Sequence, residues 1–243
     1  MELSFAISDW SGWCSNQAAD LNIPYTAKLI SSDCPDASAM PPMIRRKLNL
    51  LGRACAGVVM KLIPQDIDVP IVYCSQHGDI DRTMNVLNDL TIGEPISPTN
   101  FSLAVHNAIC GVISIHTNNN ASISALSFGQ EGLIPVLLEA MGFMDAGDSS
   151  VLCILCDTSL PEIFHDSCAY IEIPYAAAFM LNKEEGIGLE LNQRPNDSET
   201  KALLLGGCEA LKFMEFLESD RLEFLTMHND CLWQVARKGC LKC

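Results

Sequence analysis

The residues with the clearest chemical pattern lie between Asn107 and Gly132, NAICGVISIHTNNNASISALSFGQEG. The pattern predicts a helix, a turn, a short strand and a tight exit into a second helix. In an α/β protein, such an exit from strand to helix is where a nucleophile is presented. The residue at this position is Gln130, whose amide has no nucleophilic chemistry. Gln130 therefore marks either an ordinary polar helix start or a subunit that has the shape of an enzyme without its nucleophile.

Cys110 offers a thiol in the same stretch. It lies inside an apolar helical pattern, where a free cysteine usually packs as a small hydrophobic side chain. A reactive thiol instead needs an accessible and electropositive setting. The pattern therefore favours packing over catalysis for Cys110.

Two groups of residues have spacings related to metal binding. Cys153 and Cys156 form a C-x-x-C on a predicted strand, where their odd spacing directs the two thiols to opposite faces. A second group has the spacing H-x2-C-x8-C-x2-C, which is able to hold a structural zinc ion: His228, Cys231, Cys240 and Cys243. Because chain ends are often poorly ordered, zinc is a minor alternative, and no metal or cofactor is expected.

The other histidines show no partner pattern for a catalytic triad and are expected to make structural contacts: His77, His106, His116 and His165. A role in shaping a tunnel is the alternative for His106. Three aspartates are spread over a loop and a strand end and are interpreted as turn residues: Asp145, Asp148 and Asp157. No phosphate-binding loop or dinucleotide fingerprint occurs in the sequence.

Strands and helices that could position these side chains alternate along the chain. Apolar patterns predict strands at 3–8, 68–74, 121–127, 150–157, 170–181 and 187–191. Helical spacing predicts helices at 43–62, 81–90, 101–115 and 132–141. This order predicts a layered α/β sheet within residues 1–192.

The C-terminal part follows the clearest linker of the chain, QRPNDSET at 193–200. After it, helices are predicted at 201–219 and 221–238, the first with its apolar residues on roughly one side. We therefore expect two parts, residues 1–192 and residues 193–243, with the C-terminal helices packed on the same domain.

Composition excludes several classes of function. The 243 residues carry a formal charge of −15, which argues against nucleic acid and anionic membranes as partners. No run of about 18 uncharged apolar residues suggests a membrane span, and the first residues lack a secretory pattern. Twelve cysteines without such a signal are interpreted as reduced thiols, so a cytoplasmic location is expected.

The 107–132 stretch resembles the N-terminal half of the β-ketoacyl synthases, which have the thiolase-like fold. Four residues fit the family pattern N-x-x-x-G-x-x-S-I: Asn107, Gly111, Ser114 and Ile115. Ser122–Ser127 fits the strand that delivers the catalytic cysteine, and the cysteine position falls on Gln130. Residues 5–13, 73–87 and 94–115 are similar to the ketosynthase-like subgroup of polyene and polyketide gene clusters.

The resemblance implies a thiolase-like half with the order βαβαβαββ, followed by a short helical C-terminal extension in place of the second repeat. Condensing enzymes of the family need an acylated cysteine and two histidines, or histidine and asparagine, from that repeat. With Gln130 at the first position, the chain resembles the chain-length factors of type II polyketide and aryl polyene synthases. These are catalytically silent subunits that pair with an active β-ketoacyl synthase and shape the acyl tunnel.

In thiolase-like dimers, the strand before the nucleophile pairs with its mate across the two-fold axis. The resemblance therefore implies a set of interface or tunnel residues: Phe101, His106, Asn107, Ile123, Ala125, Ser127, Phe128 and Gln130. Because acyl carrier proteins are also acidic, carrier docking is expected mainly on the partner. The alternative function is an independent thiolase-like acyltransferase or decarboxylase acting on acyl carrier protein thioesters.

Overall fold

The computed structural model describes residues 3–16, 26–63, 66, 68–128, 132–167, 173–195 and 208–238. Its strands are β1 Leu3–Cys14, β2 Leu29–Ser31, β3 Ile71–Cys74, β4 Ile123–Leu126, β5 Ser150–Asp157, β6 Tyr175–Asn182, β7 Ile187–Arg194, β8 Glu223–His228 and β9 Cys231–Arg237. Its helices are α1 Pro42–Arg45, α2 Leu50–Val59, α3 Ile80–Ile92, α4 Pro98–Leu103, α5 Ala108–Thr117, α6 Leu133–Ala146 and α8 Glu209–Glu218, with a 3-10 helix η2 at Glu162–Ser167.

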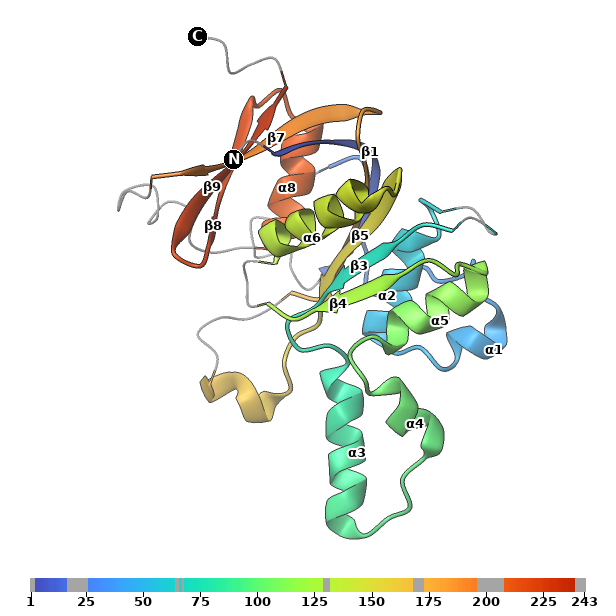
Figure 1. The fold of residues 1–243 in the computed structure, drawn as a ribbon. Coiled ribbons are helices and arrows are strands. Elements are labelled where there is room, and N and C mark those ends of the chain that lie inside the picture. Colours follow the sequence, from blue (N-terminus) through green and yellow to red (C-terminus); the bar gives the residue numbers. More distant parts are fainter. Residues whose placement is uncertain are drawn as a thin grey trace.

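The strands form one nine-stranded sheet in the order β4-β3-β5-β6-β1-β7-β9-β8, with β2 beside β1 (Figure 1). Strands β4, β3 and β5 are parallel, and the pairs from β5 onward along this order are antiparallel. The expected α/β class is confirmed. None of the described helices has the length and apolar character to cross a membrane.

Helices cover both faces of this sheet, and the described residues form a large hydrophobic core on each face. Helices α6 and α8 pack on one face, and α2 and α5 pack on the other. Strand β5 contributes to both cores, because Cys153 belongs to the first and Cys156 to the second. This two-sided burial explains why 150–157 is a continuous apolar run rather than an alternating one.

Strand β1 is longer than the predicted 3–8 because it pairs with three strands along its length, β7, β6 and β2. Its first residues, Leu3–Ile7, pair with β7, and its later part pairs with β6 through Cys14. The β6–β7 turn passes over β1 at Gly186, which has φ +106°. A Cβ at Gly186 would lie 2.2 Å from the carbonyl oxygen of Ile7, so only glycine fits there.

Two predicted helices are each divided. The 43–62 helix consists of α1 and α2, because the Asn49 side chain accepts a hydrogen bond from the Gly52 N–H (3.2 Å) and starts a new helix. The 101–115 helix consists of α4 and α5, separated by a turn at 104–107. Asn107 therefore lies at the start of α5 and not inside a long helix.

The second C-terminal helix, predicted at 221–238, is wrong. Strands β8 and β9 form a hairpin whose turn residues Asn229 and Asp230 have positive φ values of +49° and +59°. Strand β9 pairs with β7, so this segment extends the sheet instead of capping it. Of the first predicted helix, α8 forms, while 201–207 lies outside the described residues. The division at residue 192 stays a prediction.

Arg237 of β9 joins the hairpin to the end of α8. Its guanidinium donates hydrogen bonds to four carbonyl oxygens, those of Phe216 (3.2 Å), Leu217 (3.1 Å), Ser219 (2.8 Å) and Arg221 (3.0 Å). Its charge also lies 5.3 Å from the Phe216 ring centroid. Arg237 thus satisfies the free carbonyl groups that every helix end leaves.

We expect Arg237→Met to lower the free energy of unfolding by about 2–4 kcal/mol, since several half-buried carbonyl groups lose a charged donor. Urea denaturation measures this change. Arg221→Met is the control, because its exposed guanidinium lies 3.6 Å from Glu215 and contributes about 0.5 kcal/mol or less. Equal losses in the two variants would contradict the assigned role of Arg237.

Candidate functional site

The candidate site lies where the carboxyl ends of β3, β4 and β5 meet. These strands are parallel, so Ser75, Ser127 and Asp157 emerge at the same edge of the sheet. Ligand sites of α/β sheets commonly form at this edge. The first turn of α6 also begins here, after Gly132.

Asp157 fixes the loop that follows β3. Its carboxylate accepts hydrogen bonds from Ser75 Oγ (2.7 Å), the Gln76 N–H (2.9 Å) and the His77 N–H (3.4 Å). Burial raises the pKa of Asp157, while these hydrogen bonds act in the opposite direction. The interpretation of Asp157 as a turn residue is wrong, because its buried carboxylate serves a segment about 80 residues away. The acid at the end of the apolar 150–157 run was the available sequence signal.

His106 connects the α4–α5 turn to the end of β4. Its Nε2 lies 2.9 Å from the Leu126 carbonyl oxygen, and its ring meets Tyr73 edge to face at 5.4 Å. Gly78, at φ +61°, lets the loop pass close by, because an added Cβ would lie 2.9 Å from His106 Nδ1. His106 therefore makes the structural hydrogen bond that its pattern predicted.

The end of β4 is held on two sides. Ser127 Oγ donates a hydrogen bond to the Gln76 carbonyl oxygen (2.9 Å), and the Phe128 ring meets His228 of the hairpin edge to face at 5.7 Å. Gln130 lies outside the described residues, since 129–131 are not described. The structure thus brings Ser127, Phe128 and His106 to one end of β4.

The other predicted interface residues do not meet at this point. On β4, Ile123 packs partly against the α2 and α5 core and Ala125 is exposed. Phe101 lies on α4 and is 62% exposed. Asn107 is exposed at the start of α5, and its side chain makes no capping hydrogen bond.

Sequence reasoning missed Glu209, which contacts the start of α6. Glu209 Oε2 accepts a hydrogen bond from the Leu133 N–H (2.8 Å), and the Thr226 hydroxyl of β8 donates to Oε1. The two partners of the first contact lie 76 residues apart. Nothing in the local pattern of 201–219 indicates such a contact.

The thiols near the site are protonated at neutral pH. Burial raises the pKa of Cys74 to about 12, and burial does the same for Cys208. Cys110 is fully buried, and burial raises the pKa of its thiol well above the ordinary value. Such a thiol stays protonated at neutral pH, and a protonated thiol is a weak nucleophile. The structure therefore contradicts the catalytic alternative for Cys110.

The described residues of the two groups with metal-binding spacing are not arranged as a metal centre. Cys153 and Cys156 point into opposite cores, as their spacing predicted, and Cys156 Sγ lies 3.1 Å from Cys55 Sγ. His228 and Cys231 face each other across the hairpin end, whereas Cys240 and Cys243 lie outside the described residues. Among the residues that the structure describes, no group of three or more potential ligands is suited to a metal ion.

Comparison with protein families gives one match that spans most of the chain. The model of the β-ketoacyl synthase N-terminal domain matches residues 10–234. A comparison with curated protein sequences found no significant match.

Solved structures share this fold. A chain in the structure of a ketosynthase with its chain length factor from Xenorhabdus doucetiae is 23% identical, with a TM-score of 0.74, and the alignment covers 97% of this chain and 100% of that one. A chain of the ishigamide ketosynthase/chain length factor is 10% identical, with a TM-score of 0.72 and coverage of 97% and 99%. A β-ketoacyl synthase from Burkholderia phymatum is 10% identical, with a TM-score of 0.54, and only 60% of that chain is covered. These similarities confirm the thiolase-like fold.

Proposed function

Because this chain belongs to the β-ketoacyl synthase N-terminal domain family, we propose that it is a chain-length factor, the catalytically silent subunit of a heterodimer. Its partner is an active β-ketoacyl synthase, and together they form the tunnel that receives a growing polyketide or polyene chain. The two similar structures that are covered almost completely both contain a ketosynthase and a chain length factor. Their coverage supports a subunit of similar length.

The observation that carries the proposal is the position of β4 at the end of the sheet. On the side that faces β3, the Ile71 N–H donates a hydrogen bond to the Ser122 carbonyl oxygen (3.0 Å), and the Ser75 N–H donates one to the Leu126 carbonyl oxygen (3.3 Å). Because successive residues of a strand alternate in direction, the backbone groups of Ala125 point to the open side. Within the described chain, β4 has no strand on that side. An open edge of this kind is a template for a partner strand.

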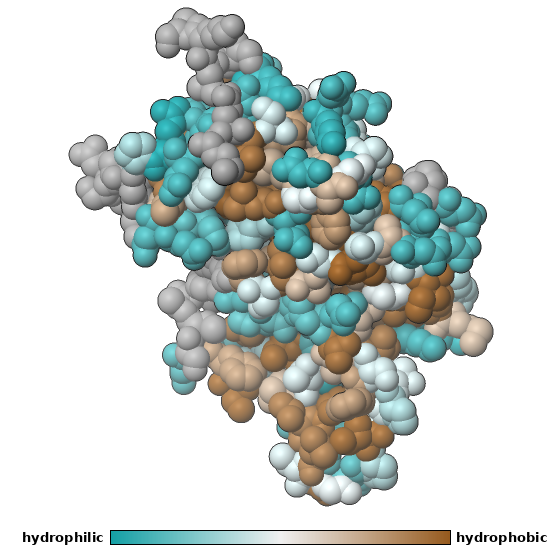
Figure 2. All heavy atoms as spheres, viewed as in Figure 1, coloured by the Kyte–Doolittle hydropathy of each residue, from teal (hydrophilic) through white to brown (hydrophobic). Residues whose placement is uncertain are grey.

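Exposed apolar side chains near this edge support the proposal that a partner covers a large surface of this chain. Helices α3 and α4 extend away from the sheet as a separate unit (Figure 1). The exposed apolar residues of this unit and of the turn after it are Leu87, Leu90, Ile92, Phe101 and Val105. Figure 2 shows apolar surface over this end of the molecule. Such a concentration is typical of a surface that a partner covers.

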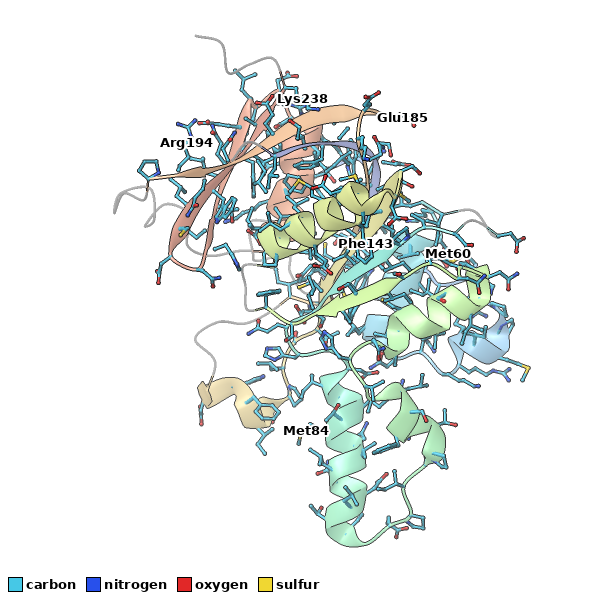
Figure 3. All side chains as sticks on the ribbon, in the orientation of Figure 1. Met60, Met84, Phe143, Glu185, Arg194 and Lys238 are labelled. Carbon is cyan, nitrogen blue, oxygen red and sulfur yellow. The ribbon has the colours of Figure 1, made fainter. Side chains whose placement is uncertain are left out.

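An open groove of mixed polar and apolar lining lies beside α3. Its apolar lining residues are Met84 of α3, Pro161 just before η2 and Ile163 of η2, which is 71% exposed. The other lining residues are polar and lie on α3: Asp81, Asn85 and Asn88. Figure 3 shows Met84 on α3. The groove therefore offers both apolar side chains and hydrogen-bonding groups to a partner.

The chemistry of the site supports a silent subunit over the enzyme alternative. The resemblance places an amide, Gln130, at the nucleophile position. The nearby thiols of Cys74 and Cys208 have pKa values of about 12 and carry no charge at neutral pH. A condensing reaction needs a thiolate that accepts the acyl group. This chain thus contributes shape to the tunnel, while the partner contributes the thiolate.

The charge of −15 supports binding of the acyl carrier protein by the ketosynthase subunit and not by this chain. Like charges slow the encounter of two acidic proteins. We therefore propose that the acyl carrier protein docks mainly on the ketosynthase subunit, in the cytoplasm.

Co-expression with the β-ketoacyl synthase of the same biosynthetic system tests this function. We expect the two chains to elute together from size-exclusion chromatography. We also expect this chain alone to release no carbon dioxide from malonyl-loaded carrier protein above the uncatalysed rate. A chain that never co-elutes would contradict the heterodimer, and decarboxylation without a partner would favour the acyltransferase or decarboxylase alternative.

A further inference from the structure

One face of α3 carries polar side chains that have no partner in the described part of the chain. Asp81, Asn85 and Asn88 follow the spacing i, i+4 and i+7, so they lie on the same side of the helix, and all three line the groove beside η2. Among the described residues, the Asp81 carboxylate has no ion pair, and neither asparagine side chain makes a hydrogen bond. Their hydrogen-bonding capacity is therefore left for a molecule that enters the groove.

The groove has an acidic character. Its lining includes the Asp81 carboxylate and no Lys or Arg side chain. Helix η2, which contributes to the other wall, also carries Glu162 and Asp166, and both are exposed. Partial burial raises the pKa of Asp81, and the negative charge of Asp79 adds to this effect. A positive charge in the groove therefore stabilises the Asp81 carboxylate.

Arg82, the residue that follows Asp81, is engaged elsewhere. Its Nε donates a hydrogen bond to Asp79 Oδ2 at 2.8 Å. Its Nη1 donates to Asn100 Oδ1 (3.2 Å), and its Nη2 donates to the Lys47 carbonyl oxygen (2.8 Å). Within the described chain, the guanidinium of Arg82 thus joins the starts of α3 and α4 and does not complement Asp81.

Apolar side chains complete the groove. Met84 lies between Asp81 and Asn88 on α3, and Pro161 and Ile163 line the other side (Figure 3). The volume of about 490 Å³ leaves room for a long side chain and its neighbours. An arginine suits this lining, because its apolar stem packs on apolar groups while its guanidinium donates to carboxylate and amide oxygens at once.

The position of the groove favours the ketosynthase as the source of this cation. Leu87, Leu90 and Ile92 of the same helix are exposed and belong to the surface that the proposed partner covers. The acyl carrier protein is acidic, so the charge of Asp81 and of η2 disfavours it. The ketosynthase is thus the partner that matches both the place and the charge.

We propose that the groove between α3 and η2 receives a positively charged side chain of the ketosynthase subunit, an arginine by preference, which pairs with Asp81 and hydrogen-bonds to Asn85 and Asn88. Apolar residues beside this side chain contact Met84 and Ile163. Asp81 then contributes to the choice of ketosynthase, because a subunit without the matching cation leaves the carboxylate covered and unpaired. This inference rests on the proposed function and adds a contact that is separate from the β4 edge.

A competition experiment tests the role of Asp81. The ketosynthase is co-expressed with equal amounts of the unsubstituted chain and a tagged variant, and the ratio in which the two chains co-purify gives their relative affinity. We expect a loss of about 10-fold or more for Asp81→Asn, because the cation of the partner stays unpaired. We expect about 100-fold or more for Asp81→Arg, because repulsion is added.

Glu185 provides matched controls. It is exposed in the β6–β7 turn, at the opposite end of the molecule from Met84 (Figure 3). Glu185→Gln and Glu185→Arg change the net charge as the two Asp81 variants do. Both controls are expected to co-purify within about twofold of the unsubstituted chain, since exposed charges outside an interface contribute little.

A photochemical cross-link identifies the occupant while the charge of the groove is kept. The amino acid p-benzoylphenylalanine is placed at the position of Asn88 in the full-length chain, and the assembled complex is irradiated. We expect mass spectrometry to find a ketosynthase peptide in which an arginine or lysine lies beside apolar residues. The same amino acid at the position of Glu185 is expected to give no ketosynthase product.

Equal co-purification of both Asp81 variants with the unsubstituted chain would overturn the inference, as would an equal loss from Glu185→Arg. A cross-link to the acyl carrier protein, to a ketosynthase segment without a cation, or to no protein in the assembled complex would also overturn it. The proposed heterodimer stands in each of these cases, because the unsubstituted chain still co-purifies with the ketosynthase. If the unsubstituted chain does not co-purify, the proposed function fails, and the assignment of the groove fails with it.

Discussion

Ala125→Asp is expected to abolish assembly with the ketosynthase, with a loss of affinity of about 100-fold or more. Ala125 is exposed on β4, and its backbone groups point to the open side of the sheet. In the proposed heterodimer, a partner strand covers this position and excludes water. An aspartate there would bury a charge without a partner, at a cost of several kcal/mol.

Affinity co-purification and light scattering measure this loss of assembly. Leu222→Asp is the matched control, because Leu222 is 57% exposed and lies just ahead of β8, the strand at the opposite edge. We expect this control to assemble normally, and circular dichroism to show both variants folded. If both variants assemble equally well, β4 is not the interface.

Asp157→Ala is expected to lower the free energy of unfolding by about 2–3 kcal/mol at pH 7. The substitution leaves the Ser75 hydroxyl and the Gln76 N–H without their acceptor, and the loop after β3 loses its attachment to β5. The substitution also removes the free-energy cost of burying the Asp157 carboxylate, which offsets part of this loss. Urea denaturation measures the change, and Asp145→Ala, at an exposed position in α6, is expected to stay within about 0.5 kcal/mol of the unsubstituted protein.

The pH dependence of this difference follows from the raised pKa of Asp157. Between the ordinary aspartate pKa of about 3.9 and the raised pKa in the folded state, the folded protein binds more protons than the unfolded chain. The contribution of Asp157 is therefore largest at low pH and decreases as the pH rises through this window. We expect Asp157→Ala to cost more at pH 4 than at pH 7. A cost that increases with pH would contradict the assigned direction.

Local patterns were sufficient for most of the sheet. The continuous apolar run at 150–157 predicted a strand buried on both faces, and β5 contributes alternate residues to the two cores. Local patterns failed where a short turn divides a segment whose apolar residues have no single spacing. The turn at Asn229 and Asp230 was a signal for a hairpin, yet the apolar spacing of 221–238 was interpreted as a helix.

Contacts within the site were much harder to predict. Asp157 serves a loop about 80 residues earlier, and Glu209 serves a helix 76 residues earlier. A carboxylate at the start of a helix or the end of a strand is able to accept hydrogen bonds from many parts of a protein. The residues next to it in the sequence do not show which part it contacts. Only the groups that contact each carboxylate in the folded structure show which role it has.

The sequence by itself determined the family and the α/β class, because apolar periodicity and the 107–132 motif are local properties. The tertiary structure decided which groups act together at the site. It placed β4 at an open edge, attached the loop after β3 to Asp157, and brought Glu209 to the start of α6. The physical reason is that hydrogen bonds and charges act through distance in space, which local spacing along the chain does not specify.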